Sequence, residues 1–161
     1  METQSRRIDQ KCNRQFYDLI NSTKRFKIHQ GGTRSGKTYA ICQYITYLIT
    51  KSEKPLVISI IRKTLPALKG SVLRDIIQIL EQTGIYYLGV HNKSTNTFEY
   101  GKHLIEFLSV DEPQKIRGRK RNIAFLNEGN ELNIEDFRQI NMRTLVQYFE
   151  PNVLAQSPST A

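Results

Sequence analysis

The chain has 161 residues, 39% of them hydrophobic, a size and composition that suit one domain with a single buried core rather than two full domains. Lys and Arg number 24 against 15 Asp and Glu, and the formal net charge of +9 favours a polyanionic partner such as a nucleotide or nucleic acid. Cys12 and Cys42 lack the spacing of a zinc site or disulfide framework, and the short apolar runs and polar N-terminus lack the features of a transmembrane span or signal peptide, so we expect a soluble protein of a reducing cell interior.

The first part of the chain predicts two helices separated by a strand and a glycine-rich loop. An amphipathic helix is expected over residues 8–20, and residues 25–30, RFKIHQ, are expected to form a short strand. Apolar side chains recur at helical spacing over residues 38–48. The glycine-rich loop at residues 31–38 would therefore join the end of a strand to the start of a helix.

The rest of the chain continues this alternation. Residues 55–61 are a β-branched run typical of a strand buried on both faces, and residues 73–80 have helical periodicity. Residues 95–110 alternate around a Gly-Lys turn, which predicts a β-hairpin, and residues 122–128 are a short apolar run that ends in polar side chains. The pattern predicts an α/β fold with a mostly parallel central sheet flanked by helices, in which ligands bind at the carboxyl ends of the strands.

The loop GGTRSGKT fits the pattern GxxxxGK[ST] at every position. Glycines allow backbone N–H groups to approach phosphates, Lys37 places a cation on the β and γ oxygens, and Thr38 offers a hydroxyl to Mg²⁺. A glycine turn without a ligand is the alternative. We expect a site for ATP and Mg²⁺ whose phosphate-binding residues are Gly31, Gly32, Thr33, Arg34, Ser35, Gly36, Lys37 and Thr38.

Hydrolysis of a bound triphosphate also needs a group that positions water. The only good candidate follows the apolar strand of IAFLNEGNEL, where Glu128 would orient or deprotonate the attacking water. Asn127 would contact the metal through a bound water, but its amide lacks the charge of a carboxylate, so metal binding is expected to be weaker than with Asp. The alternative is a polar strand end that simply enters a loop.

Four segments together resemble the ATPase domain of bacteriophage terminase large subunits, the motors that package double-stranded DNA into procapsids. They are KIHQGGTRSGKT, SIIRKTLPALKGSVLRDI, KIRGRKRNIAFLNEGNEL and FRQINMRT, and the resemblance covers residues 15–152. It implies a P-loop NTPase fold of the additional-strand, catalytic-glutamate (ASCE) type in residues 1–152. Residues 153–161 would be a disordered or truncated tail, and no nuclease domain is expected in this chain.

The resemblance also implies roles for individual residues. Gln30 would lie near the adenine, Glu128 would be the catalytic carboxylate, and Arg34 would sense the γ-phosphate. Arg62 matches the arginine that commonly follows the second strand of the family and is expected at the nucleotide. Arg117 lies where some members are thought to supply an arginine finger to a neighbouring subunit.

Each arginine has an alternative role. Arg34 can be a solvated cation on the loop rim, and Arg62 can form a salt bridge at its strand end. Arg117 belongs to the basic cluster KIRGRKR, which can contact the DNA backbone or simply be solvated. The segment VQYFEPN resembles the strand after the catalytic Glu, and Ser157 or Thr160 would stand near the family's coupling motif unless the tail is disordered.

The resemblance therefore predicts an ATP-hydrolysing motor domain in the cytoplasm of a bacterial host. Its partners would be double-stranded DNA, further copies of the chain in a ring on the portal protein, and the small terminase subunit, with no membrane. Two alternatives stay open: a nucleotide-binding regulatory or assembly module with little turnover, and a helicase-like DNA-remodelling ATPase.

Overall fold

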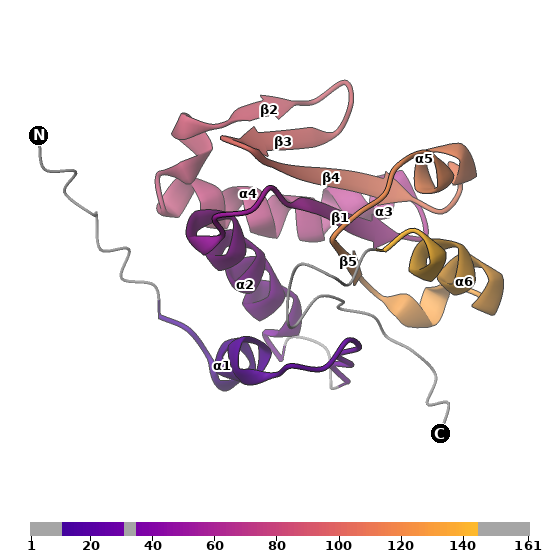
Figure 1. Ribbon diagram of the computed structural model, residues 1–161, viewed down its shortest axis with the longest axis horizontal. Coiled ribbons are helices and arrows are strands. Elements are labelled where there is room, and N and C mark those ends of the chain that lie inside the picture. Colours follow the sequence, from indigo (N-terminus) through magenta and orange to yellow (C-terminus); the bar gives the residue numbers. More distant parts are fainter. Residues whose placement is uncertain (1–10, 31–34, 145–161) are drawn as a thin grey trace, which may run out of the picture.

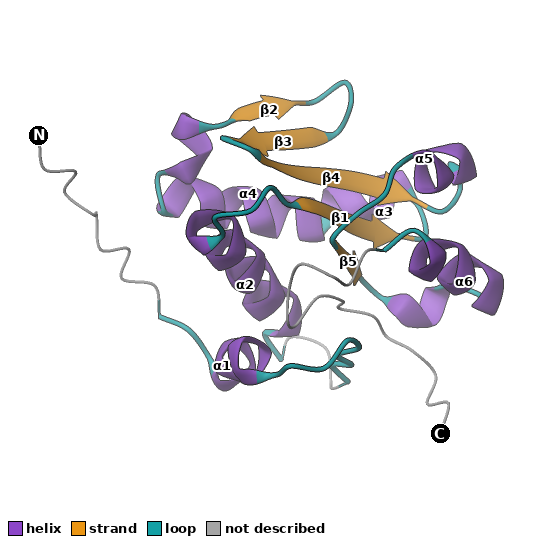
Figure 2. Cartoon of the chain, in the orientation of Figure 1, coloured by secondary structure: helices purple, strands orange, loops and turns teal. Residues whose placement is uncertain are grey.

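The computed structural model describes residues 11–30 and 35–144, which form helices packed around one sheet (Figure 1). Figure 2 shows the strands as a central layer with helices on both sides. In chain order the elements are α1 (Arg14–Asn21), α2 (Lys37–Lys51), β1 (Val57–Arg62), α3 (Leu65–Gly70), α4 (Val72–Gln82), the short helical turn η1 (Ile85–Leu88), β2 (Val90–Asn92), β3 (Thr97–Tyr100), β4 (His103–Ser109), α5 (Pro113–Gly118), β5 (Ile123–Leu126), the turn η2 (Gly129–Glu131) and α6 (Ile134–Met142).

The sheet has five strands in the order β2-β3-β4-β1-β5. Strand β1 pairs in parallel with β4 on one side and with β5 on the other. Strands β2, β3 and β4 form an antiparallel meander, so the expected hairpin is present and joined by a further short strand. The predicted α/β fold, with a central sheet flanked by helices, is confirmed, and β1 and β5 lie within a residue or two of their predicted bounds. The sheet is mixed rather than mostly parallel, because the β2-β3 and β3-β4 pairings are antiparallel while the two pairings of β1 are parallel.

The two faces of the sheet carry cores of different size, because successive side chains of each strand point to opposite faces. Ile58 and Ile60 of β1 belong to the large core formed with α1, α2, α3 and α4. Ile61 belongs to a smaller core with Leu126 and with residues of α5 and α6. No helix among residues 11–30 and 35–144 is long and apolar enough to cross a bilayer.

The strand predicted at residues 25–30 is wrong, because within this segment only Phe26 takes part in a β-bridge. Here Lys27 is buried, while Phe26 and Ile28 are 37% and 49% exposed. The Lys27 ammonium donates a hydrogen bond of 2.7 Å to the carbonyl oxygen of Leu19 and lies 5.1 Å from the ring centre of Tyr44. These contacts turn the lysine inward, so the apolar alternation of the segment does not face the core.

Other boundaries differ in smaller ways. The first helix begins at Arg14, because the Asn13 side chain accepts a hydrogen bond from the Phe16 N–H and caps the helix. Helix α6 begins with a capping box between Asn133 and Asp136 and was not predicted, and neither were α3 and α5. Residues 31–34 of the loop, the segment VQYFEPN, Ser157 and Thr160 lie outside the described residues.

Candidate functional site

The candidate site lies at the carboxyl edge of the sheet, where β1 and β5 end side by side. Ile61 pairs with Leu126, and the Asn127 N–H donates a 2.9 Å hydrogen bond to the Ile61 carbonyl. Since Ile61 and Leu126 pack toward α5 and α6, the next residue on each strand points to the opposite face. The side chains of Arg62 and Asn127 therefore extend to the side of the sheet that carries α2 and α4.

Helix α2 begins at this edge with a turn that requires glycine. Gly36 has φ 76° and ψ 10°, a left-handed conformation that side chains disfavour, and a Cβ there would lie 3.1 Å from Asn13 Nδ2. The N-cap residue Gly36 has no side chain, so no side-chain cap hydrogen bond is present at this helix start. An uncapped start of a long helix is a favourable place for an anion, because N–H groups and the helix dipole converge there.

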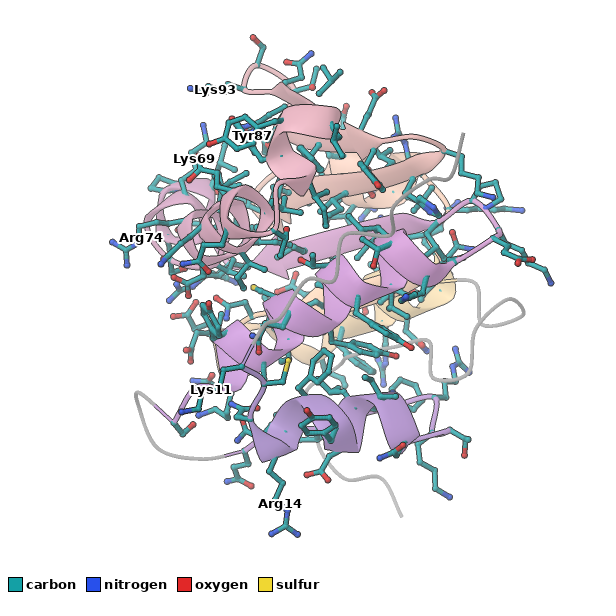
Figure 3. The ribbon with its side chains drawn as sticks, turned by 90° about the vertical axis from the view of Figure 1, so that its left-hand side faces the viewer. Lys11, Arg14, Lys69, Arg74, Tyr87 and Lys93 are labelled. Atoms are coloured by element: carbon teal, nitrogen blue, oxygen red, sulfur yellow. The ribbon has the colours of Figure 1, made fainter. Side chains whose placement is uncertain are left out.

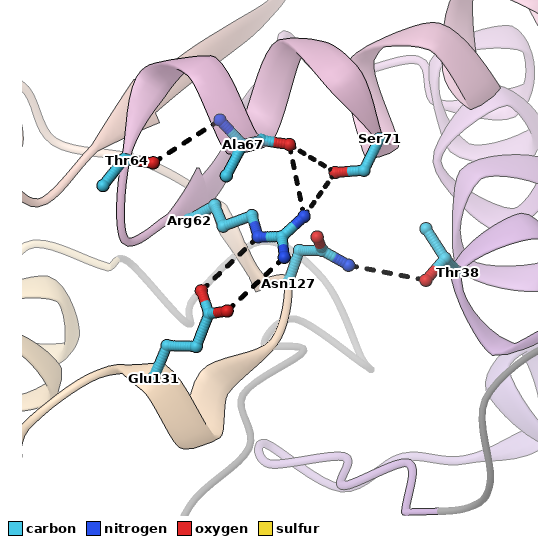
Figure 4. Close-up of polar contacts among 7 residues, drawn as sticks. All are labelled: Thr38, Arg62, Thr64, Ala67, Ser71, Asn127 and Glu131. Carbon is cyan, nitrogen blue, oxygen red and sulfur yellow. Dashed lines mark hydrogen bonds and ion pairs between the residues drawn. The ribbon is translucent and has the colours of Figure 1, made fainter.

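Two side chains of the first turn of α2, Lys37 and Thr38, make hydrogen bonds at this edge. The Lys37 ammonium donates a hydrogen bond of 2.9 Å to Ser35 Oγ, and both residues belong to the glycine-rich loop at residues 31–38. The Thr38 hydroxyl oxygen accepts a hydrogen bond of 3.4 Å from Asn127 Nδ2 (Figure 4). The structure thus brings the end of β5 to the start of α2, although the two residues are 89 positions apart.

Asn127 fits a site for Mg²⁺. Asn127 is 4% exposed, and its Oδ1 has no hydrogen-bond partner among the described residues. A buried amide oxygen without a donor is uncommon, since most buried polar atoms are paired. Mg²⁺ takes oxygen ligands and keeps several of its waters, so the Thr38 hydroxyl and a water held by Asn127 Oδ1 suit this ion. No group of three or more His, Cys, Asp or Glu in the described part of the chain could hold a metal by itself.

Glu128 follows Asn127 in a left-handed conformation with φ 53° and ψ 51° and begins the turn η2. Such a conformation is uncommon for a residue other than glycine, and it is often found at functional sites. The side chain is exposed, and no hydrogen bond or ion pair holds its carboxylate within residues 11–30 and 35–144. Glu128 thus follows Asn127 directly, at the end of β5 where the candidate site lies.

Arg62, at the end of β1, connects the junction of α3 and α4 with the turn η2 (Figure 4). Its Nη1 donates hydrogen bonds to Ser71 Oγ at 2.6 Å and to the Ala67 carbonyl at 3.2 Å, at the junction of α3 and α4. Its Nε and Nη2 face the Glu131 carboxylate at 3.5 and 3.4 Å. The strand-end salt bridge is therefore present.

Of the remaining predicted residues, the structure describes only Gln30 and Arg117. Gln30 is exposed, and Gly31, Gly32, Thr33 and Arg34 lie outside the described residues. Arg117 is exposed on α5, which covers the face opposite to α2. Arg117 is therefore not joined to Lys37 and Thr38 within one chain.

A buried charge cluster on the α5 side was missed by sequence reasoning. Glu106 of β4 is 5% exposed, and its carboxylate accepts a hydrogen bond from the Ser59 hydroxyl. It lies 3.9 Å from Nε of the fully buried Arg121 and 3.7 Å from Nη1 of Arg119. Arg121 Nη2 also donates a 2.8 Å hydrogen bond to the Ile116 carbonyl of α5. The available signal was an acidic residue at an inward position of an apolar strand.

Comparison with known proteins gives a family and a fold. The family model described as phage terminase large subunit matches residues 23–154, and no curated protein matches the chain significantly. The large terminase of a thermophilic bacteriophage in complex with ADP superposes with a TM-score of 0.74 at 15% identity, over 90% of this chain and 38% of that chain. The Thermus phage P74-26 large terminase ATPase domain superposes with a TM-score of 0.72 at 13% identity, over 94% of this chain and 67% of that chain.

A third structure, the same thermophilic phage terminase in complex with ATP-gamma-S, has a TM-score of 0.66 at 15% identity and covers 90% of this chain. The present chain spans about two fifths of the length of the large terminases that it matches. The share is 39% for a further crystal form of the same thermophilic phage terminase. At these identities the likeness establishes the fold, which is that of large terminase ATPase domains.

Proposed function

The chain belongs to the phage terminase large subunit family, and on that premise we propose that it binds and hydrolyses ATP as the motor domain of a DNA-packaging machine. The observation that carries the proposal is the contact between Thr38, in the first turn of α2, and Asn127, at the end of β5. It brings a phosphate-binding helix start and a strand end with a free carboxylate to one edge of the sheet. That juxtaposition is what phosphoryl transfer to water requires.

The phosphates of ATP bind at the start of α2. Backbone N–H groups near Gly36 donate to phosphate oxygens, and the Lys37 ammonium contributes the charge that the helix dipole alone does not. Thr38 and Asn127 hold Mg²⁺, which neutralises part of the phosphate charge when bound. Gln30 and Arg34 are assigned to the adenine and the γ-phosphate on the family resemblance alone.

Glu128 is the catalytic carboxylate. It orients a water molecule for in-line attack on the γ-phosphorus and accepts a proton from it. The left-handed backbone of Glu128 supports this role, because a strained conformation at a strand end re-aims a side chain away from the sheet. Arg117 acts on a neighbouring copy of the chain, which agrees with its exposure and with its position on the face opposite to α2.

Double-stranded DNA is the proposed polyanionic partner, with the portal protein and the small terminase subunit as the partners that the family implies. A net charge of +9 supports DNA binding. Figure 3 shows Lys69, Arg74 and Lys93 extending outward on one side of the molecule, from α3, α4 and the hairpin region. All three side chains are exposed. Such cations bind phosphates of the backbone without reading sequence.

A second candidate function is a nucleotide-binding module with little turnover. It is favoured by one observation, the amide of Asn127 in a place where a carboxylate would bind Mg²⁺ more strongly. In that case ATP binding would serve assembly or regulation rather than movement.

Phosphate release from MgATP separates the two functions. We expect turnover by the full chain that is lost in Glu128→Gln and in Lys37→Ala, with nucleotide binding kept in Glu128→Gln and weakened in Lys37→Ala. Glu135→Gln, a change of another exposed carboxylate on α6, is the matched control and should leave turnover unchanged. Binding without turnover in the unmodified chain, at every protein concentration, would favour the second function. A specific activity that rises with protein concentration, and does not rise in Arg117→Ala, is expected for the trans role.

A further inference from the structure

The guanidinium of Arg62 has two hydrogen-bonding edges that are held in different ways (Figure 4). One edge points inward, where Nη1 donates to Ser71 Oγ at 2.6 Å and to the Ala67 carbonyl at 3.2 Å. The other edge, Nε with Nη2, faces the two carboxylate oxygens of Glu131. The inward edge fixes the position of the guanidinium, so the second edge is held ready for an anion with two oxygens.

Glu131 occupies this second edge only loosely. The two donor-to-acceptor distances are 3.5 and 3.4 Å, whereas charge-assisted pairs of this kind usually measure about 2.7–2.9 Å. The Glu131 side chain is 38% exposed and that of Arg62 is 17% exposed. A partly exposed ion pair with long distances contributes little, because water competes with the carboxylate for the guanidinium. A phosphate group, which carries more charge and the same pair of oxygens, is a stronger partner for that edge.

The Arg62 guanidinium stands at the edge where phosphates are proposed to bind. Arg62 and Asn127 follow the paired residues Ile61 and Leu126, and their side chains leave the sheet on the same face. Asn127 in turn contacts Thr38 at the start of α2. Glu131 closes the turn η2 that begins at the proposed catalytic Glu128.

We propose that Glu131 is an internal competitor of the nucleotide for Arg62. Without nucleotide, the Nε–Nη2 edge of Arg62 binds the Glu131 carboxylate, and with nucleotide the same edge binds a phosphate and Glu131 is released into solvent. Glu131 therefore lowers the affinity of the site, acting through Arg62. The inference rests on the proposed function, because it takes the ligand to be a nucleoside triphosphate.

The test is a double-mutant cycle with ATP-gamma-S as the probe. Its dissociation constant is measured by calorimetry for the full chain, Glu131→Gln, Arg62→Gln and the double variant. Glu131→Gln should bind roughly two- to fivefold more tightly, the range expected when a weak exposed ion pair no longer competes. Arg62→Gln should bind more weakly than the unmodified chain. In the Arg62→Gln background, Glu131→Gln should change the affinity by less than the measurement error.

The cycle distinguishes competition from a simple change of charge. Removing an acidic group near a phosphate site can tighten binding by long-range electrostatics alone, but that gain would be the same in both backgrounds and would overturn the proposal. Weaker binding in Glu131→Gln would also overturn it. Glu135→Gln on α6 is the matched charge control and should leave the affinity unchanged. If Arg62→Gln does not fold, Arg62→Lys replaces it, since an ammonium cannot pair with two oxygens through a rigid fork.

Failure of the proposed function gives a different result. If the unmodified chain does not bind ATP-gamma-S, both the nucleotide site and the competition are wrong. If it binds ATP-gamma-S with the same affinity as Glu131→Gln, only the competition is wrong.

Discussion

Each face of the sheet has a buried cation beside it, and the two cations are held in different ways. Lys27 lies against α1 and α2 on the side of the large core, and Arg121 lies beneath α5 on the side of the small core. Lys27 is 7% exposed and Arg121 is 0% exposed. Burial of a charge is costly unless the charge is paired or removed, so each site needs its own solution.

Lys27 has no carboxylate partner among the described residues. Its ammonium donates to the Leu19 carbonyl and lies over the Tyr44 ring. Burial lowers the pKa of Lys27 from 10.5 to about 7, because removal from water disfavours the charged form. The lysine can therefore lose its proton near neutral pH and stay buried as a neutral amine.

Arg121 cannot follow the same route, since a guanidinium keeps its proton at any ordinary pH. Burial lowers the pKa of Arg121, while the nearby Glu106 carboxylate acts in the opposite direction. Glu106 in turn is held by the Ser59 hydroxyl and lies near Arg119. A buried lysine can therefore be tolerated by loss of its proton, whereas a buried arginine requires a buried acid.

The largest expected effect is that of Glu106→Gln. The change keeps the shape of the side chain but leaves the buried Arg121 guanidinium without its counter-charge, so the free energy of unfolding should fall by about 3–5 kcal/mol. Urea denaturation followed by circular dichroism measures the loss. Glu99→Gln on the neighbouring strand β3, where the side chain is exposed, is the matched control and should change stability by less than about 0.5 kcal/mol.

A double variant sharpens the same prediction. Arg121→Met in the Glu106→Gln background removes the orphaned cation, and most of the lost stability should return. If Glu106→Gln alone is neutral, or if the double variant is less stable than the single one, the buried pair is not what holds this face together.

The second prediction concerns Lys27 and pH. Because its pKa is about 7 in the folded chain and 10.5 when unfolded, the unfolded state binds more protons between these values, and stability should rise with pH from about pH 7. The rise is at most about 1.4 kcal/mol per pH unit. Lys27→Met should remove it. Urea denaturation at several pH values between about 7 and 9 measures the slope in both proteins.

Two other buried groups, Cys42 and Tyr44, oppose the rise in stability at higher pH. Burial raises the pKa of Cys42 and of Tyr44 above their ordinary values of 9.0 and 10.0, so these groups make stability fall as pH increases further. Lys24→Met, a change of an exposed lysine, is the matched control and should keep the wild-type slope. Equal slopes in Lys27→Met and the unmodified chain would mean that Lys27 keeps its charge when buried.

The contrast between the two cations also marks what the sequence could predict. Helix α2, strands β1 and β5 and the hairpin were predicted because their signals are local. The helix has apolar residues at helical spacing, the two strands are apolar runs, and the hairpin has a Gly-Lys turn. Arg121 belongs to the basic cluster KIRGRKR, for which the sequence suggests DNA contact or solvation, since nothing local distinguishes it from Arg119 or Lys120. Its burial depends on Glu106, fifteen residues away in the chain and brought close only by the fold.

The candidate site divides in the same way. The GxxxxGK[ST] pattern located Gly36, Lys37 and Thr38, and a strand end with polar residues located Asn127, because both signals are contiguous in sequence. A salt bridge of Arg62 at its strand end was one of the predicted alternatives, but its partner Glu131 is 69 residues away and has no local signal. The prediction of a strand at residues 25–30 was wrong for a related reason, since the contacts of Lys27 with Leu19 and Tyr44 outweigh the alternation of apolar residues.

The third prediction separates the two partners of Glu106. Arg119 lies 3.7 Å from the carboxylate but its side chain is 52% exposed, so water can replace it. Arg119→Gln should therefore lower the free energy of unfolding by only about 0.5–1 kcal/mol, the range of partly exposed ion pairs. Urea denaturation in low and in high salt measures the loss, which should shrink as salt increases. A loss equal to that of Glu106→Gln would contradict the idea that burial, rather than distance, decides the strength of these pairs.

The smallest expected effect is that of Glu131→Gln on stability. Its ion pair with Arg62 is partly exposed, and the inward edge of Arg62 keeps its bonds to Ser71 and Ala67 in the variant. The free energy of unfolding should change by less than about 0.5 kcal/mol, because a weak surface pair exchanges for water at little cost. Thermal unfolding without nucleotide measures it, with Lys63→Gln, which breaks the ion pair to Asp136 at 3.5 Å, as a matched surface pair. A loss near that of Glu106→Gln would mean that Glu131 is a structural anchor of η2, and such an anchor could not be displaced by a phosphate.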